Sequence, residues 1–203
     1  MRAKRIDVSA AFFIELEFQE TGSFVYRFYK SSLGRMPNAN EFMADRALVV
    51  AGPNLEANKQ AFANGWVQRA EFLQRYPSNQ SGPAFIDSLL QTVQQSSGVN
   101  LQPLRPALMT EWGANASRAR IVRMVVDAPA FVQAEYNSSF VLMQYFGYLR
   151  RDPDPGGFSF WLNVLNNQTP NNYKGMVCAF LTSAEYQLRF GGNVTHTNSE
   201  CGP

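Results

Sequence analysis

The residues that come closest to a metal site lie in the segment 152–157, which reads DPDPGG. Calcium loops also alternate acidic residues before glycine, but they need six or more oxygen ligands and, in an EF-hand, a distal glutamate. Asn163 stands where that glutamate would be. We therefore interpret Asp154 as the N-cap of a helix that begins at Pro155. A calcium site at Asp152 and Asp154 is kept as the alternative, and no other metal or cofactor is expected.

Residues for catalysis are few. His196 is the only histidine and lies in a polar segment, so a Ser-His-Asp or Cys-His arrangement would have to use it. The sequence contains no G-x-S-x-G motif and no glycine loop that would cradle a phosphate. Acids such as Glu111 and Asp127 could meet in space as a glycosidase pair, but nothing in the sequence singles them out. We expect no enzymatic activity, with an unrecognised hydrolase as the alternative.

Two arginines and two glutamates occupy matching places. Arg35 and Arg151 each follow a helical stretch, and Glu71 and Glu185 each precede an aromatic residue later in the chain. An arginine can hold a carboxylate with two parallel hydrogen bonds, which would tie a turn to a distant helix. We predict the ion pairs Arg35–Glu71 and Arg151–Glu185. The alternative is that the arginines bind carbonyl groups at helix C-termini.

These arginines belong to a pattern that occurs twice. Residues 24–38 read FVYRFYKSSLGRMPN and residues 140–154 read FVLMQYFGYLRRDPD, with six identities in fifteen positions. In the first copy Val25, Tyr29 and Leu33 are spaced as one apolar face of a helix. Each copy therefore predicts a helix, a tight turn and a second helix.

The ends of these helices are marked by residue type. Gly34 and then Pro37 end the first helix, and Pro153 ends its counterpart, because proline disfavours helical geometry in the preceding residue. Asn38 stands three residues before Glu41, a variant of the capping box. Asn38 and Asp154 are thus the predicted helix caps.

A second motif closes each copy: a large apolar residue, four further positions, an acid and an aromatic residue. It occurs at residues 66–72 and 180–186, at residues 12–18 near the start, and without its acid at residues 125–131. Residues 85–94 supply a degraded front half. In this middle stretch Ser96 replaces the arginine and Ala130 the acid, and the joint loss supports the predicted pairing.

The predicted fold is all-α, built from tandem helical repeats that share cores, because one helix pair cannot bury its own apolar face. We expect residues 1–203 to form a single domain. Its parts are a trailing half-unit (6–22), unit one (23–77), a degenerate unit two (84–136), unit three (139–191) and a tail (192–203). The odd half-unit indicates a repeat array whose earlier part is missing or encoded elsewhere.

Composition excludes several classes of protein. A net charge of +2 with no Lys/Arg cluster beyond residue 5 gives no basic face for nucleic acid. No apolar run approaches the roughly 18 residues of a membrane span. The N-terminal residues are basic but lack the apolar stretch of a secretory signal, so none is expected in this chain.

The chain resembles a bacterial family catalogued as domain of unknown function 4214. The resemblance lies in SAAFFIELEFQETGSFVYRFYKSSLGRMPN, FVLMQYFGYLRRDPDPGGFSFWL and MVCAFLTSAEYQLRFG, and is close at residues 6–50 and 140–191. The family's pattern is similar to that of phycobilisome linker domains. The resemblance implies tandem all-helical copies within large secreted or surface-attached bacterial proteins, without an established activity. The middle unit lacks the Gly-Arg-x-Pro turn.

An exported family and an even cysteine count indicate a disulfide between Cys178 and Cys201 that ties the tail to unit three. A buried free thiol with a loose tail is the alternative. We expect an extracellular or cell-surface interaction or spacer module, whose partners are other domains of its parent protein, surface proteins or polysaccharide. The runner-up function is a carbohydrate- or ligand-binding module, with calcium as a conceivable aid and Trp112 and Tyr148 as candidate stacking residues. Ligand, partner and oligomeric state do not follow from the sequence.

Overall fold

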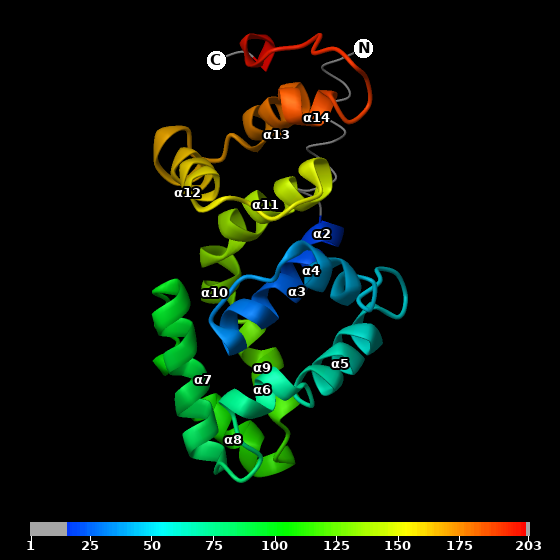
Figure 1. Ribbon diagram of the computed structural model, residues 1–203. Coiled ribbons are helices and arrows are strands. Elements are labelled where there is room, and N and C mark those ends of the chain that lie inside the picture. Colours follow the sequence, from blue (N-terminus) through cyan, green and yellow to red (C-terminus); the bar gives the residue numbers. More distant parts are fainter. Residues whose placement is uncertain (1–15, 202–203) are drawn as a thin grey trace. The chain divides into compact units, whose positions relative to one another are not determined.

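The computed structural model describes residues 16–201, and all regular secondary structure in this range is helical (Figure 1). The predicted all-α class is therefore confirmed. The described residues group into two compact units. One comprises residues 20–136, and the other comprises residues from Asn137 onwards together with those up to Gln19. Residues 6–15, the larger part of the predicted half-unit, lie outside the described range.

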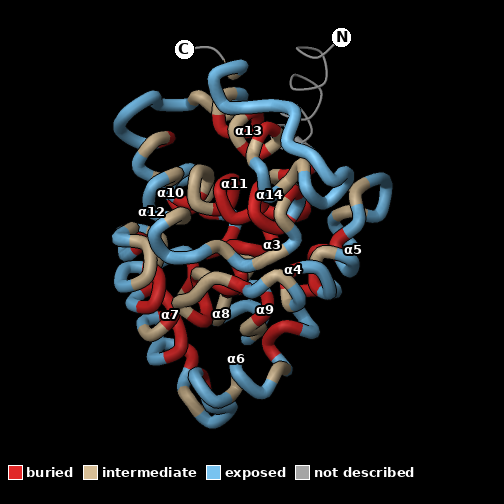
Figure 2. Tube along the Cα trace, turned by 45° about the horizontal axis from the view of Figure 1, so that its top comes forward, coloured by how far each residue is buried: buried red, intermediate tan, exposed pale blue. Residues whose placement is uncertain are grey.

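The unit of residues 20–136 is an arrangement of short helices around α9. Its elements are α3 (Gly22–Phe28), the π-helical turn η1 (Tyr29–Leu33), α4 (Ala39–Arg46), α5 (Leu55–Trp66), α6 (Ala70–Arg75), α7 (Gly82–Ser97), the 3-10 turn η2 (Gln102–Leu104), α8 (Arg105–Asn115), α9 (Arg118–Val126) and α10 (Pro129–Ala134). Helix α9 packs against α3, α5, α7 and α8. Buried residues gather along α3, α7 and α9 (Figure 2).

Aromatic side chains fill much of this core. Phe28 packs edge-on against Phe62 and Trp66, with ring centroids 5.1 and 5.5 Å away. Tyr76 packs in the same way against Phe85 of α7 at 5.3 Å. Burying such large rings supplies much of the stabilisation that the hydrophobic effect gives this fold.

The last turn of the first predicted helix is wider than an α-helical turn. Residues 29–33 form a π-helical turn, and Gly34 ends it in the left-handed conformation, with φ of 72°. Carbonyl groups near this end accept hydrogen bonds from other helices. The Tyr76 hydroxyl donates to the Ser32 oxygen at 2.9 Å and Ser96 donates to the Lys30 oxygen at 3.0 Å. These bonds satisfy acceptors that an ending helix leaves open.

The second unit contains the other copy of the turn. Its elements are α2 (Leu16–Glu20), α11 (Tyr136–Gln144), the π-helical turn η3 (Tyr145–Leu149), α12 (Pro155–Asn163), the π-helical turn η4 (Val164–Gln168), α13 (Tyr173–Thr182), α14 (Ala184–Gln187) and the 3-10 turn η5 (Asn198–Cys201). Glu20 and Tyr136, at the end of α2 and the start of α11, are counted in the first unit. The segments 24–38 and 140–154 thus run through the same series of an α-helix, a π turn, a left-handed residue and a capped helix.

The structure corrects two details of the sequence pattern. The helix before Pro153 ends at Leu149, because Arg150 adopts the left-handed conformation with φ of 56°, three residues before the proline. Ser96 does not occupy a turn: it lies in the last turn of α7, and Gly98 is the left-handed residue that follows. The interpretation of the chain as one domain of repeated units stays a prediction.

Candidate functional site

The first cluster of charged side chains forms where η1 is followed by α4 and α6. The Arg35 guanidinium donates to both oxygens of Glu71, from Nε at 2.8 Å and from Nη2 at 2.7 Å. It also donates to both oxygens of Glu41, from Nη1 at 2.9 Å and from Nη2 at 2.8 Å. We call Arg35, Glu41 and Glu71 the Arg35 clamp. It ties the turn to the start of α4 and to the first turn of α6.

Glu41 also takes part in the predicted helix cap. The Asn38 side chain accepts from the Glu41 backbone at 2.9 Å, and the Glu41 carboxylate accepts from the Asn38 backbone at 2.8 Å. This reciprocal pair is a capping box, which satisfies two backbone donors that would otherwise be open. The hydrogen bonds from Arg35 lower the pKa of Glu41 and of Glu71, so both carboxylates stay ionised.

The second cluster repeats this arrangement in the other unit. Arg151 donates to both oxygens of Glu185, from Nε at 2.7 Å and from Nη2 at 2.9 Å, and lowers the pKa of Glu185. Arg151 and Glu185 are called the Arg151 clamp below. Both arginines also lie over an aromatic ring of their π turn, Arg35 at 5.2 Å from the centre of Tyr29 and Arg151 at 5.3 Å from that of Tyr145. The structure thus brings both predicted arginine–glutamate pairs together.

Asp154 lies beside the Arg151 clamp and serves as a helix cap. Its Oδ1 accepts from the backbone of Gly157 at 2.7 Å, and its Oδ2 lies 3.7 Å from Arg151 Nη1. Within residues 16–201, no group of three or more His, Cys, Asp or Glu side chains is arranged to hold a metal ion. Both carboxylate oxygens of Asp154 are therefore engaged by groups of the protein itself, and a calcium site at Asp152 and Asp154 stays the alternative.

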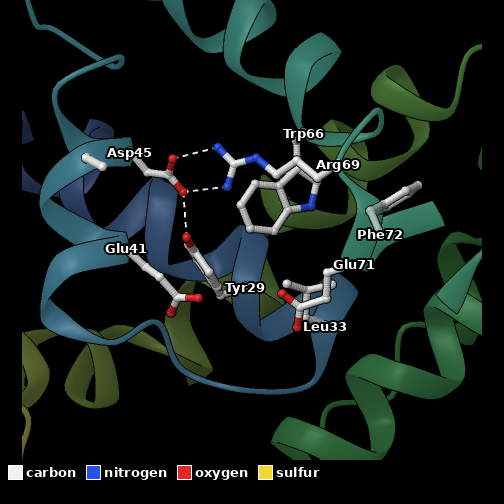
Figure 3. A pocket seen from close by; sticks show the side chains of 9 residues that line it. Tyr29, Leu33, Glu41, Asp45, Trp66, Arg69, Glu71 and Phe72 are labelled. Carbon is white, nitrogen blue, oxygen red and sulfur yellow. Dashed lines mark hydrogen bonds and ion pairs between the residues drawn. The ribbon is translucent and has the colours of Figure 1, made fainter. Parts of the chain in front are cut away.

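A pocket of about 220 Å³ opens next to the Arg35 clamp (Figure 3). Its chemistry centres on Asp45, which the sequence patterns did not single out. Arg69 donates to Asp45 with both terminal nitrogens, at 2.7 and 2.5 Å, and the Tyr29 hydroxyl donates to the same carboxylate at 2.6 Å. Figure 3 shows these three side chains converging from η1, α4 and the start of α6.

Aromatic side chains, among them Tyr29 and Trp66, form part of the wall of this pocket. The Arg69 guanidinium lies 4.3 Å from the ring of Trp66, whose indole nitrogen donates to Ser32 at 2.8 Å. Burial and the hydrogen bond to Asp45 raise the pKa of Tyr29, which keeps its hydroxyl protonated as a donor. Asp45, Glu41 and Glu71 each have an arginine partner. The arrangement can therefore hold helices together, whereas a catalytic carboxylate would need room to exchange a proton with a substrate.

Sequence analysis missed Asp45 and Arg69, although a signal was present. Counted from the helix caps, Trp161 stands in the other unit where Asp45 stands here, and Ser183 stands where Arg69 stands. The two charges are therefore present together in one copy and absent together from the other. The same argument led to the prediction of the arginine–glutamate pairs.

The two acids considered as a glycosidase pair do line one surface hollow of about 360 Å³. Each is bound by an arginine: Glu111 by Arg120, and Asp127 by Arg123 at 3.0 Å. Arg123 also binds Glu56 at 3.1 Å. These ion pairs connect α5, α8 and α9. The charged residues that line the hollow therefore form an ion-pair network on the protein surface.

Cys178 of α13 and Cys201 are joined in a disulfide, with their Cα atoms 5.6 Å apart. The tail is held further by Gln187, whose side chain bonds the backbones of Thr195 and His196 at 2.9 Å. His196 itself lies 3.4 Å from Glu200 on an exposed loop. His196 therefore has the features of a residue that organises the tail.

The aromatic residues considered for sugar stacking are mostly enclosed. Tyr148 is buried, with ring centroids 5.7 Å from Tyr186 and 6.3 Å from Phe180. Trp112 is half-buried, and its indole fills the space over Gly82, where a Cβ would lie about 2.0 Å from Trp112 Nε1. The ring of Tyr148 is therefore enclosed, and that of Trp112 is partly covered.

Comparison with known proteins identifies part of the chain. Residues 126–190 match a family described as "Domain of unknown function (DUF4214)", which confirms the predicted family for this segment. No curated protein and no solved structure matches the chain. In the described part of the chain, no helix combines the length and the apolar character that crossing a membrane requires. The tandem copies and the relation to phycobilisome linkers stay predictions.

Proposed function

Because residues 126–190 belong to the DUF4214 family, whose description assigns no activity, we propose a function from the geometry. The chain is a non-enzymatic interaction or spacer module of a larger exported or surface-attached bacterial protein. One observation carries the non-enzymatic part: the charged groups of the pocket beside Tyr29 are bound to one another. Asp45 binds Arg69 and Tyr29, and Glu41 and Glu71 share Arg35. Charges used in this way fix helix positions.

Export is supported by the disulfide between Cys178 and Cys201. Disulfides persist in oxidising compartments and are rare where glutathione and thioredoxin keep thiols reduced. A disulfide that anchors a tail suits a domain that must keep its shape outside the cytosol. The bond that holds Cys178 and Cys201 together therefore supports the proposed export.

An interaction role is supported by large apolar side chains at the surface of each unit. Met43, Leu48 and Val50 are exposed in the unit of residues 20–136. The other unit exposes the side chains of Phe160, Leu188, Phe190 and Val194. Exposed apolar patches mark interaction sites or ligand-binding grooves, and these side chains are the candidates for such a patch in each unit.

The test uses the protein in its own bacterium. A photo-reactive amino acid is placed at Leu48 or at Phe190, both exposed, and at the exposed polar residue Gln74 as the matched control. Illumination of intact cells should give discrete protein adducts from the two apolar positions and none from the control. Differential alkylation of the same samples should find Cys178 and Cys201 oxidised in the surface fraction.

The opposite results are equally clear. Reduced cysteines in a cytosolic fraction would contradict export. Equal adducts from all three positions would contradict a specific interaction surface. Adducts with polysaccharide alone would favour the carbohydrate-binding alternative over a protein partner.

A further inference from the structure

The side chains around the pocket beside Tyr29 carry more negative than positive charge (Figure 3). The acidic side chains that line it are Glu41, Asp45 and Glu71, and the basic one is Arg69. Arg35 binds Glu41 and Glu71 from outside this lining. Three carboxylates against two guanidinium groups leave the cluster one positive charge short. A cationic group that entered the pocket would therefore meet a favourable potential.

One of these carboxylates has acceptor positions that the described residues leave open. A carboxylate can accept about four hydrogen bonds, whereas Glu71 accepts two within the described part of the chain, both from Arg35. Arg35 uses all of its N–H donors on Glu71, Glu41 and the Met36 carbonyl, so it has none left to give. The Glu71 side chain is also 50% exposed. A donor that arrives from solvent can therefore bind Glu71 without displacing Arg35.

Much of the remaining wall of the pocket is apolar. Leu33, Trp66 and Phe72 line the pocket and are buried. Ala44 of α4 also lines it but is exposed, so the pocket reaches the protein surface beside α4. The volume of about 220 Å³ is below the roughly 300–1,000 Å³ of sites for drug-sized ligands. The pocket thus suits a ligand of the size of one side chain, with an apolar stem and a positive end.

The second unit fills the corresponding place with its own side chains. Counted from the helix caps, Phe160 and Trp161 stand where Ala44 and Asp45 stand in the first unit. The Trp161 ring lies 5.2 Å from Phe160 and 5.6 Å from Phe180, so aromatic rings occupy this volume. Unfilled volume forfeits packing contacts. The open pocket of the first unit is therefore a feature of that copy, and the shared backbone frame does not require it.

We propose that this pocket binds the side chain of an arginine from a partner protein, with the guanidinium on Glu71 and the stem against Leu33 and Phe72. This inference rests on the proposed interaction function and names one contact of its partner. Arginine suits the pocket better than lysine, because its planar guanidinium can bind a carboxylate with two parallel hydrogen bonds and is more weakly hydrated than an ammonium group. Arginine is also among the residues that contribute most to binding when they enter a pocket at a protein interface.

The surface of α4 beside the pocket would shield such a contact from water. Met43, Ala44, Ala47 and Leu48 are exposed and follow one another at helical spacing on α4 and the turn after it. These side chains are uncharged, so a partner that covered them would exclude water from the arginine–carboxylate contact and strengthen it. The charge of the pocket selects the arginine, and the apolar surface beside it supports the contact.

The experiment titrates the full disulfide-bonded chain with N-acetyl-arginine amide, which carries the side chain between neutral ends. Heteronuclear NMR follows the indole N–H of Trp66, which lines the pocket, with those of Trp112 and Trp161 as internal references. We expect a saturable shift of the Trp66 signal alone, with a dissociation constant of about 1–10 mM. N-acetyl-citrulline amide has the same shape without the charge and should bind at least about tenfold more weakly.

Two pairs of variants locate the binding. Ala44→Phe places a ring in the pocket and should abolish the shift, whereas Ala47→Phe, at an exposed residue outside the pocket lining, should leave it unchanged. Glu71→Gln should weaken binding at least about tenfold. Its matched control is Glu185→Gln, which changes the same position of the Arg151 clamp and should leave the affinity unchanged. Thermal unfolding of each variant checks that the fold is kept.

A second measurement tests the partner in intact cells. Ala44→Phe should remove the protein adduct that a photo-reactive residue at Leu48 forms, since both positions are exposed on the same side of α4 and the turn after it. Ala47→Ser, which leaves the pocket open, is the control and should keep the adduct. An adduct that Ala44→Phe leaves unchanged would contradict the pocket's part in binding the partner.

Further results would overturn the proposal. They are no saturable shift up to about 50 mM probe and equal affinity for the arginine and citrulline probes. Arg2, Lys4 and Arg5 lie outside the described range, so a chain with Arg2→Gln, Lys4→Gln and Arg5→Gln is titrated as well. Probe binding at least about tenfold tighter than to the native chain would assign the pocket to this chain's own basic residues. If the probe fails while photo-crosslinking at Leu48 or Phe190 still captures a discrete protein, this inference falls and the proposed function stands.

Discussion

The Arg35 clamp and the Arg151 clamp sit on the same backbone frame but are filled differently. Both follow a π turn and a left-handed residue, both join that turn to the start of a later helix, and both place an arginine over a tyrosine ring. Beyond the clamp, one copy has the ion pair of the buried Asp45 with the half-buried Arg69. The other has Trp161, whose ring lies 5.6 Å from Phe180, and Ser183.

This difference shows which part of the arrangement the backbone needs. The space beside the turn is filled in one copy by an ion pair and in the other by an aromatic ring. Buried ion pairs can be replaced by well-packed apolar residues without loss of stability, provided that both charges go together. The place of Glu41 is also filled differently in the two copies. Its counterpart is Gly157, where a Cβ would lie 2.3 Å from the Tyr145 hydroxyl, so this hydroxyl takes up the space of a side chain. The pairs Arg35–Glu71 and Arg151–Glu185, which both copies have, hold the turn, whereas the residues that differ between the copies fill the space beside it.

The largest expected effect comes from breaking the pair that only one copy has. Asp45→Ala would leave Arg69 and the Tyr29 hydroxyl without their shared acceptor. We expect the free energy of unfolding to fall by about 3 kcal/mol, measured by urea unfolding. Asp45→Trp combined with Arg69→Ser, which copies the other unit, should lose less than Asp45→Ala alone. A double variant less stable than the single one would contradict the comparison.

Removal of the disulfide should affect one unit and spare the other. Cys178→Ser with Cys201→Ser opens a loop with a sequence separation of 23 residues. In the chain-entropy account this costs roughly 3 kcal/mol. Hydrogen exchange followed by mass spectrometry should show faster exchange at residues 173–201 and unchanged exchange at residues 20–136. Equal acceleration in both units would mean that the two units unfold together.

The two clamps should differ in strength. Arg35 binds two carboxylates, whereas Arg151 binds one and lies 3.7 Å from a second. Both arginines are partly exposed, so solvent reduces the value of each pair. We expect Arg35→Ala to cost about 2 kcal/mol and Arg151→Ala about 1 kcal/mol, measured under the same conditions. The reverse order would show that neighbours of the clamp, and not the clamp, set its contribution.

The smallest expected effect is the response to acid. Arg35 lowers the pKa of Glu41 and Glu71 below the unfolded value of 4.5, and Arg151 does the same for Glu185. Because the unfolded chain binds these protons first, the stabilisation is complete above pH 4.5 and is lost as the pH falls through the lowered pKa values. Unfolding midpoints measured between pH 5 and pH 3 should fall less steeply for Arg35→Ala than for Arg151→Ala.

The sequence was informative wherever two copies could be compared. The pairs of Arg35 and Arg151 with their glutamates were predictable because arginine and acid are kept together and lost together. The caps at Asn38 and Asp154 were predictable because residue type and spacing specify them locally. The Asp45–Arg69 pair was missed because the comparison used identical residues, whereas this pair appears only as a shared difference. The π turns escaped prediction because apolar residues spaced at 25, 29 and 33 fit ordinary helical geometry equally well.

The π turns also decide where the chain tolerates the loss of a residue. A π turn contains one residue more than an α-helical turn of the same span. Deleting a single residue from Tyr145–Leu149 would therefore allow ordinary α-helical bonding over that span and leave the residues that follow in place. Deleting one residue from α11 would instead rotate everything after it by about 100° around the helix axis. Arg151 would then face away from Glu185, and a contact that spans 34 residues would be lost.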